Sequence, residues 1–326
     1  MAAISDVSVQ DEISVPSMFS FTFHIGGANG GFEGVDLDLF KPGDEITIFM
    51  GIGSARQLIS GDITAIEPSF STSSASATIR GFDRMYWLKF GTRVKSYEML
   101  SDSEIVVDVA KTSGLPVTPQ GSADTINAYV LQDNISNYQF LLDRCRHLDY
   151  ELLMAGTTLV FRPCAEGLGA LRTLAYPRDL GSVDLNLKLP TSGASVTAIG
   201  YDAETNTIIT AVAETPSQQD KMGGQQTGYQ AAARFPDSGV TIECPNISDP
   251  AALQAVAEAR YQELLKDFIE GQASLAGDSA LVAGVNVKFS GLSARFDGTY
   301  YITSSTHRYD ESTGYQCEIR VRRTGL

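Results

Sequence analysis

Three histidines, His24, His147 and His307, are the side chains best suited to acid–base chemistry or metal binding. No two of them have the short spacing on which zinc motifs depend, so the sequence predicts no metal site. His307 is followed by Asp310, which could orient an imidazole. Catalytic pairs are defined by geometry, however, and histidines in strands usually pack or cap. We therefore predict no catalytic histidine and no cofactor.

Carboxylates offer a second chemistry. Asp36 and Asp38 fall on one face of a strand-like segment, and Glu45 follows closely. Two carboxylates roughly 5–10 Å apart can cleave a glycosidic bond. A chain with 39 acidic residues has many such pairs on its surface, so we interpret these three as surface acids.

Nucleotide-binding and serine-hydrolase motifs are missing from the sequence. The glycine runs at 26–31 and 51–53 lack both the Walker lysine and the dinucleotide-binding spacing. No Gly-x-Ser-x-Gly elbow is present. We interpret the glycine runs as turns and predict that the protein is not an enzyme.

Composition limits the class of protein. The 326 residues are 43% hydrophobic and predict two or three domains with buried cores. The net charge of −15 opposes stable nucleic-acid binding. The four cysteines are far apart in sequence, which indicates buried thiols in a reducing compartment. No apolar run reaches the ~20 residues that cross a bilayer, and the first residues do not resemble a signal peptide, so we predict no membrane insertion.

Residues 1–88 have the pattern of strands and turns. Apolar and polar residues alternate in Phe19–Phe23 and Glu45–Phe49, and short strand-like residues follow in Ala75–Phe82. Such strands bury one face only. We predict a first β-barrel-like domain over 1–88.

Residues 89–165 indicate a mixed α/β domain. A capping box at 101–104 predicts a helix that ends near Gly114, and a second box at 136–139 predicts another. The segment 150–162 has the pattern of a hairpin that turns at Gly156. We expect this domain to be inserted between two β domains.

Residues 166–326 indicate a second β-barrel-like domain. Val183 to Leu189 alternate strictly, and two strands at 195–201 and 207–213 are expected to pair. The closing strands are expected at 285–289, 299–306 and 315–321.

Two further elements interrupt this last domain. The polar segment 215–239 predicts a long mobile loop. The segment 248–270 predicts one long helix, which begins at Ser248-Asp249-Pro250 and is ended by Gly271.

Three blocks of residues resemble a known family. The first contains Phe82, Asp83, Leu88, Lys89 and Gly91. The second contains Gln132, Ser136, Gln139, Phe140, Leu141, Tyr150 and Phe161, and the third contains Gly298, Tyr300, Tyr301, His307 and Tyr315. In order and spacing these blocks resemble the phage late control protein D family, which includes the hub portion of type VI secretion spike proteins. Asn137 stands where the family usually has an acid, and Asp149 where a glycine often precedes the tyrosine.

The resemblance implies two barrel-like tube domains that flank an α/β domain, in a mainly β chain. It also implies architectural roles for the matching residues: Asp83 at the junction of the first barrel, Ser136 and Gln139 as helix caps, and Tyr300 and Tyr301 in the second barrel. No catalytic, cofactor-binding or metal-binding residue is implied.

The function implied is that of a baseplate hub in a contractile injection machine, either a phage tail or a tail-like particle. Three copies would form a ring that adapts a sixfold tail tube to a threefold spike. The expected partners are tail-tube subunits, a separate spike polypeptide and other baseplate proteins, while DNA or cargo passes through the lumen. Assembly is expected in the bacterial cytoplasm.

Two other classes of function remain as alternatives. One is a tail-associated cell-wall or capsule polysaccharide hydrolase that uses Asp36, Asp38 and Glu45. The other is a host-surface adhesin built from β domains. The mixed segment 89–165 argues against a plain adhesin.

Overall fold

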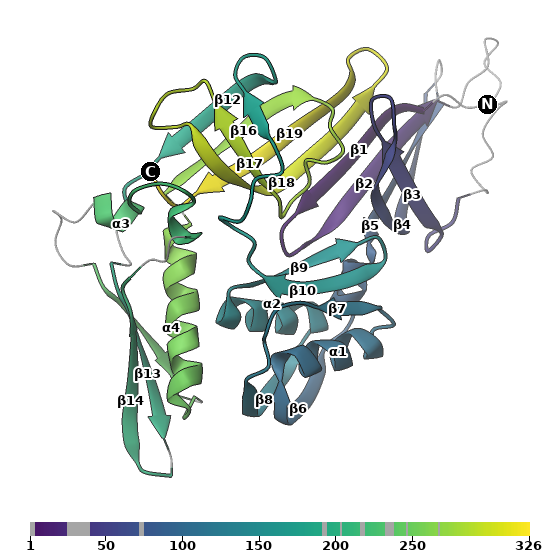
Figure 1. Ribbon diagram of the computed structural model, residues 1–326. Coiled ribbons are helices and arrows are strands. Elements are labelled where there is room, and N and C mark those ends of the chain that lie inside the picture. The colour runs from purple at the N-terminus through teal and green to yellow at the C-terminus, as the bar shows by residue number, and fades with distance from the viewer. Residues whose placement is uncertain are drawn as a thin grey trace.

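The structure is a computed structural model that describes residues 4–24, 40–71, 75–190, 194–202, 204–215, 219–231, 238–245, 247–266 and 268–326. Strands dominate these ranges, and helices cover parts of several sheets (Figure 1). The predicted fold class, mainly β with an α/β insertion, is confirmed.

One eleven-stranded sheet joins the beginning and the end of the chain. Its path runs β12-β16-β19-β18-β1-β2-β5-β4-β3, and β17 pairs with both β18 and β11. These strands are β1 Ile4–Glu12, β2 Val15–His24, β3 Glu45–Met50, β4 Arg56–Phe70, β5 Ala75–Asp83, β11 Thr173–Ala175, β12 Leu180–Leu187, β16 Ile269–Ala276, β17 Asn286–Ser290, β18 Gly298–Asp310 and β19 Gly314–Arg323.

The pairing of β1 with β18 is what links the two ends of the chain. The two strands are antiparallel, with Asp6 opposite Asp310 and Glu12 opposite Ser304 (Figure 1). The strands of the predicted first and second β domains therefore belong to one continuous sheet. Local sequence patterns did not indicate this connection.

Alternation along the strands separates a buried face from an exposed one. Phe19, Phe21 and Phe23 of β2 are buried, and so are Cys317 and Ile319 of β19. The intervening side chains are polar and lie on the other face of the sheet. This confirms the expectation of half-buried strands.

The middle of the chain forms an α/β body beside the sheet. It contains η2 Arg84–Lys89, β6 Arg93–Ser101, α1 Asp102–Thr112, β7 Val117–Pro119, β8 Ile126–Ile135, α2 Asn137–Leu148, β9 Tyr150–Ala155 and β10 Thr158–Pro163. The predicted box at Ser101 is present: its hydroxyl accepts from the Glu104 amide, and the Glu104 carboxylate accepts from the Ser101 amide. Both predicted helices and the hairpin of β9 and β10 are confirmed.

A smaller sheet and one long helix form a third body. The sheet consists of β13 Val196–Asp202, β14 Thr207–Ala213 and β15 Val240–Cys244, and it packs against α4 Pro250–Leu265. In Figure 1 this body extends away from the eleven-stranded sheet. The pairing of β13 with β14 is confirmed, and β13 pairs with β15 on its other side, so this sheet is separate from the closing strands.

The helix predicted over 248–270 is shorter than expected. α4 ends at Leu265, and Gly271 lies inside β16 rather than after a helix. β16 pairs antiparallel with β12 on one side and β19 on the other. These two ladders satisfy its backbone groups, so tertiary pairing overrides the local helical pattern.

The prediction of a mobile loop over 215–239 is wrong at two short helices, η3 Gln219–Lys221 and α3 Gly228–Ala231. Between them, Met222 and Thr227 are buried. Residues 216–218 and 232–237 of this segment lie outside the described residues. The amide of Gln226 and the carbonyl of Leu326 form a 3.2 Å hydrogen bond. The polar composition indicated a loop, but backbone groups of this segment form hydrogen bonds with the last residue of the chain.

Candidate functional site

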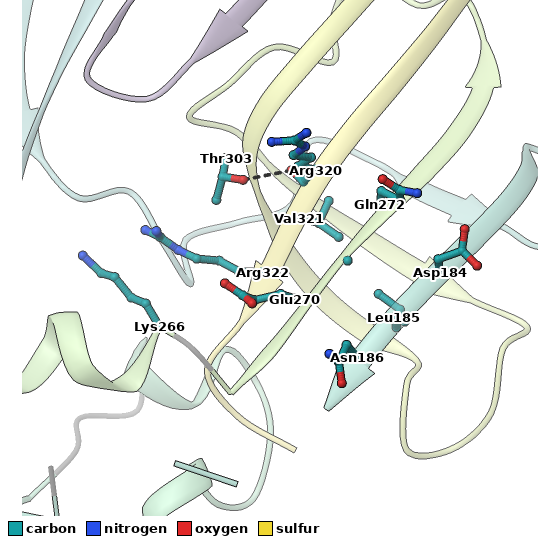
Figure 2. A pocket seen from close by; sticks show the side chains of 11 residues that line it. Asp184, Leu185, Asn186, Lys266, Glu270, Gln272, Thr303, Arg320, Val321 and Arg322 are labelled. Carbon is teal, nitrogen blue, oxygen red and sulfur yellow. Dashed lines mark hydrogen bonds between the residues drawn. The ribbon is translucent and has the colours of Figure 1, made fainter. Parts of the chain in front are cut away.

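The candidate site lies on the exposed face of the large sheet. At one end of this face, over β12, β16 and β19, lies a cleft of about 580 Å³. Figure 2 shows Lys266 and Arg322 on one side of this cleft and Asp184 on the other. Charged and amide side chains line this cleft together with Leu185 and Val321.

Salt bridges neutralise most of the charges around this cleft. The Lys266 ammonium lies 2.6 Å from the Asp149 carboxylate, and the Arg322 guanidinium lies 3.0 Å from Glu166. Lys188, directly after β12, pairs with Glu270 of β16 at 2.9 Å.

The polar face continues across β18, β1 and β2. A second cleft, of about 280 Å³, is lined by Gln10, Glu12, Val15, Pro16, Met18, Phe82, Ser304, Thr306, Glu318 and Arg320. Hydroxyls, an amide and charges of both signs share this lining with apolar residues such as Met18 and Phe82. It can make many weak, hydrated contacts with a passing or docking macromolecule.

His307 lies on the buried side of β18. Its Nε2 is 3.1 Å from the Leu281 carbonyl, which can only accept, so Nε2 carries the proton and Nδ1 accepts from the Tyr315 hydroxyl at 2.8 Å. Burial lowers the pKa of His307 to about 4. The hydrogen bonds that the structure gives Asp310 join it to Ser312 and Thr313, so the suggested orienting role of Asp310 is wrong.

The other two histidines do not converge with His307. His24 lies at the exposed end of β2. Nδ1 of His147 is 2.6 Å from the Asp143 carbonyl, and burial lowers its pKa. Within the ranges that the structure describes, no group of three or more His, Cys, Asp or Glu side chains could hold a metal ion.

The acids of the hydrolase alternative are only partly described. Asp36 and Asp38 lie outside the described residues. Glu45 forms an ion pair with Arg84 at 2.8 Å and accepts a hydrogen bond from Ser60 at 3.2 Å. Glu45 is therefore already held by structural partners.

The first motif block lies where the first β strands meet the α/β body. Asp83 is 2% exposed and accepts hydrogen bonds from the amides of Ser17 and Met85, each at 2.9 Å. Leu88 is buried in the core of the α/β body, and Gly91 adopts a left-handed φ of +69°.

The second block builds the start of α2. The Ser136 hydroxyl accepts from the Gln139 amide at 3.1 Å, while the Gln139 side chain donates to Asp143 at 2.8 Å. The Gln139 side chain therefore points along the helix and is not a reciprocal cap. Gln132 is fully buried and donates to the Ile135 carbonyl and to Asn137. Phe140, Leu141 and Phe161 are core residues, and the Tyr150 ring packs on Phe161.

The third block packs inside the sheet. The Tyr300 ring stacks on Phe289, and its hydroxyl donates to the Phe296 carbonyl. Gly298 has a φ of +148°, which favours glycine, and a Cβ there would lie 2.5 Å from the Arg323 guanidinium carbon.

Sequence reasoning missed the residues that join the α/β body to the sheet. Glu151 accepts from the Tyr301 hydroxyl, and Arg162 pairs with Glu151 at 3.3 Å and donates to the Gly284 carbonyl at 2.8 Å. The sequence feature that could have identified Glu151 is its charge in an otherwise apolar strand, Tyr150-Glu151-Leu152. Asp149, beside this strand, adopts the left-handed φ of 52° that a glycine would favour.

All four cysteines are free, and Cys145, Cys164 and Cys317 are buried as predicted, whereas Cys244 is half-buried. Burial raises the pKa of Cys317 to about 12, so this thiol stays protonated. Among the helices that the structure describes, none is long and apolar enough to cross a membrane.

Comparison with known proteins gives a family and a fold. A family model described as the Alg8 N-terminal domain matches residues 2–311. No curated protein sequence matches the chain.

Several solved structures are similar. The 43 kDa tail protein of prophage MuSo2 from Shewanella oneidensis has a TM-score of 0.76 at 11% identity, over 98% of this chain and 94% of that chain. A tail protein from Neisseria meningitidis has a TM-score of 0.72 at 12% identity, over 98% and 92%. A type VI secretion component of E. coli, described as similar to the T4 tail proteins gp27 and gp5, has a TM-score of 0.63 at 12% identity, over 100% and 74%. The chain thus has a tail-hub-like fold.

Proposed function

We propose that this chain, which belongs to the Alg8 N-terminal domain family, is a structural baseplate hub of a contractile injection machine. It would form a trimeric ring between a sixfold tail tube and a threefold spike, without catalysis. The observation that carries the proposal is the eleven-stranded sheet, which places two β regions of one chain edge to edge. Three copies would present six such regions around an axis.

The ends of this sheet suggest how copies meet. β12 and β3 are the terminal strands of its path, and unpaired strand edges tend to be covered in native assemblies. In a closed ring, β3 of one copy would lie next to β12 of the following copy. This head-to-tail contact is heterologous, because it joins two different edges of the sheet. It produces a closed ring when the rotation from each copy to the next brings the last copy back to the first.

The polar face of the sheet would then line the passage. Mixed charges and hydroxyls, such as Thr306 and Glu318 beside Arg320, give a hydrated wall without a dominant basic patch. Such a wall would let DNA or protein cargo pass without strong adhesion. The segments 1–88, 89–165 and 166–326 would serve as first tube domain, α/β domain and second tube domain.

The partners in this proposal are tail-tube subunits, a separate spike polypeptide and other baseplate proteins, in a particle assembled in the bacterial cytoplasm. Native mass spectrometry of the chain, alone and co-produced with candidate tube and spike proteins, tests the stoichiometry. We expect three copies per complex. A complex that holds a single copy would refute the ring.

A further inference from the structure

Two carboxylates, from β1 and β5, share one serine of β2, the strand that lies between them. The Ser17 hydroxyl of β2 donates to Asp11 Oδ1 of β1 at 3.0 Å. The Ser17 amide donates to Asp83 Oδ2, at the end of β5, at 2.9 Å. The three residues therefore form one hydrogen-bonded cluster across three adjacent strands.

Each carboxylate also reaches a different part of the chain with its second oxygen. Asp83 Oδ1 accepts from the Met85 amide, in the first turn of η2 and at the entrance to the α/β body. Asp11 Oδ2 accepts from the Ala283 amide at 3.0 Å, in the segment before β17. The cluster thus lies where the first strands, the α/β body and the closing strands meet.

The cations near the cluster are engaged elsewhere. Arg84 pairs with Glu45 and Asp62, Lys89 lies over the Tyr138 ring, and Arg162 pairs with Glu151 while reaching Gly284 beside Ala283. Two further titratable groups interact electrostatically with the cluster, Glu12 next to Asp11 and Tyr138 near Asp83.

The donors to the two carboxylates are backbone amides and the Ser17 hydroxyl, and none of these donors is a cation. Burial, with a smaller contribution from the Asp11 charge, raises the pKa of Asp83 to about 7, and burial also raises the pKa of Asp11.

We propose that the Asp11–Ser17–Asp83 cluster is a pH-responsive latch, which holds the three parts of the chain together while the pair retains a proton and loosens when both carboxylates are ionised. Two like charges in a buried site repel each other, and opening lets water solvate them. The latch therefore closes on acidification and loosens toward alkaline pH.

The direction follows from proton linkage. The closed state binds the Asp83 proton more tightly than the open state, in which the aspartate recovers a pKa of about 4. Opening therefore becomes easier as pH rises from about 4 to about 7, and levels off above that range.

Hydrogen exchange of the purified chain at the amides of Ser17, Met85 and Ala283 tests this latch. After correction for the intrinsic exchange rate, we expect the opening constant of wild type to rise at least about tenfold between pH 5.5 and 8. Asp83→Asn keeps an N-capping side chain without the charge and should abolish this rise. Asp310→Asn, at the end of β18 opposite Asp6, is the matched control and should keep the rise.

A second variant keeps the latch testable if Asp83→Asn does not fold. Asp11→Asn removes the charge that repels Asp83. The rise in the opening constant should therefore occur at lower pH than in wild type. A flat wild-type profile, or a rise that both variants leave unchanged, would overturn the latch. The measurement needs no partner protein, so its failure would leave the proposed ring untouched.

Discussion

The Tyr301 hydroxyl lies 2.6 and 2.7 Å from the two carboxylate oxygens of Glu151, although the residues are 150 positions apart. Both side chains are buried. Tyr301 belongs to β18 of the large sheet and Glu151 to β9 of the α/β body. This contact makes the junction between the two bodies a specific polar interface rather than a merely apolar one.

Tyr301→Phe removes this hydrogen bond and leaves a buried carboxylate with fewer donors. We expect a loss of about 1–3 kcal/mol in the free energy of unfolding, measured by urea titration. Tyr309→Phe, on an exposed position of the same strand, is the control and should change little. Equal effects of the two substitutions would argue against a stabilising role for the contact.

Ser101→Ala removes the N-cap of α1, whose hydroxyl accepts from the Glu104 amide. The expected cost is about 1 kcal/mol of stability, because one helix-end amide loses its partner. Thermal unfolding followed by circular dichroism measures it. Ser69→Ala, at an exposed position of β4, serves as the comparison and should stay within about 0.5 kcal/mol of wild type.

His307 should make the protein less stable in acid. Its folded-state pKa of about 4 lies below the value near 6.5 that an unfolded chain recovers. Protons therefore bind the unfolded state preferentially as pH falls from about 6.5 to 4, and the loss approaches about 3 kcal/mol. His307→Gln should remove this component, so the stability difference between wild type and variant should shrink from pH 7 to pH 4.5. A constant difference would contradict the lowered pKa.

Phe49→Lys tests the edge contact of the proposed ring. Phe49 is 58% exposed on the terminal strand β3, and a lysine there disfavours strand pairing between copies. We expect the dissociation constant of the trimer, measured by analytical ultracentrifugation, to rise about tenfold or more, which corresponds to ~1.4 kcal/mol. The matched control is Ile208→Lys on β14, outside the large sheet, and it should leave association intact. If only the control weakened association, the ring would not be closed through β3.

The elements with local signals were predictable from sequence. The hydroxyl and carboxylate of the Ser101–Glu104 box satisfy helix-end amides that lie within the same four residues. Alternation in Phe19–Phe23 likewise fixes which face of β2 is buried, because the strand period is two. The resemblance of three blocks to a hub family agrees with the tail-hub-like fold.

Only tertiary structure decided how these elements connect. Residues 269–276 became a strand because β12 and β19 offered hydrogen-bonding partners on both sides. The pairing of β1 with β18, the contact of Tyr301 with Glu151 and the sharing of Ser17 by Asp11 and Asp83 all join residues distant in sequence. Local sequence patterns indicate which side of an element is apolar. Buried polar pairs, in contrast, form only after folding brings distant groups into a site that excludes water.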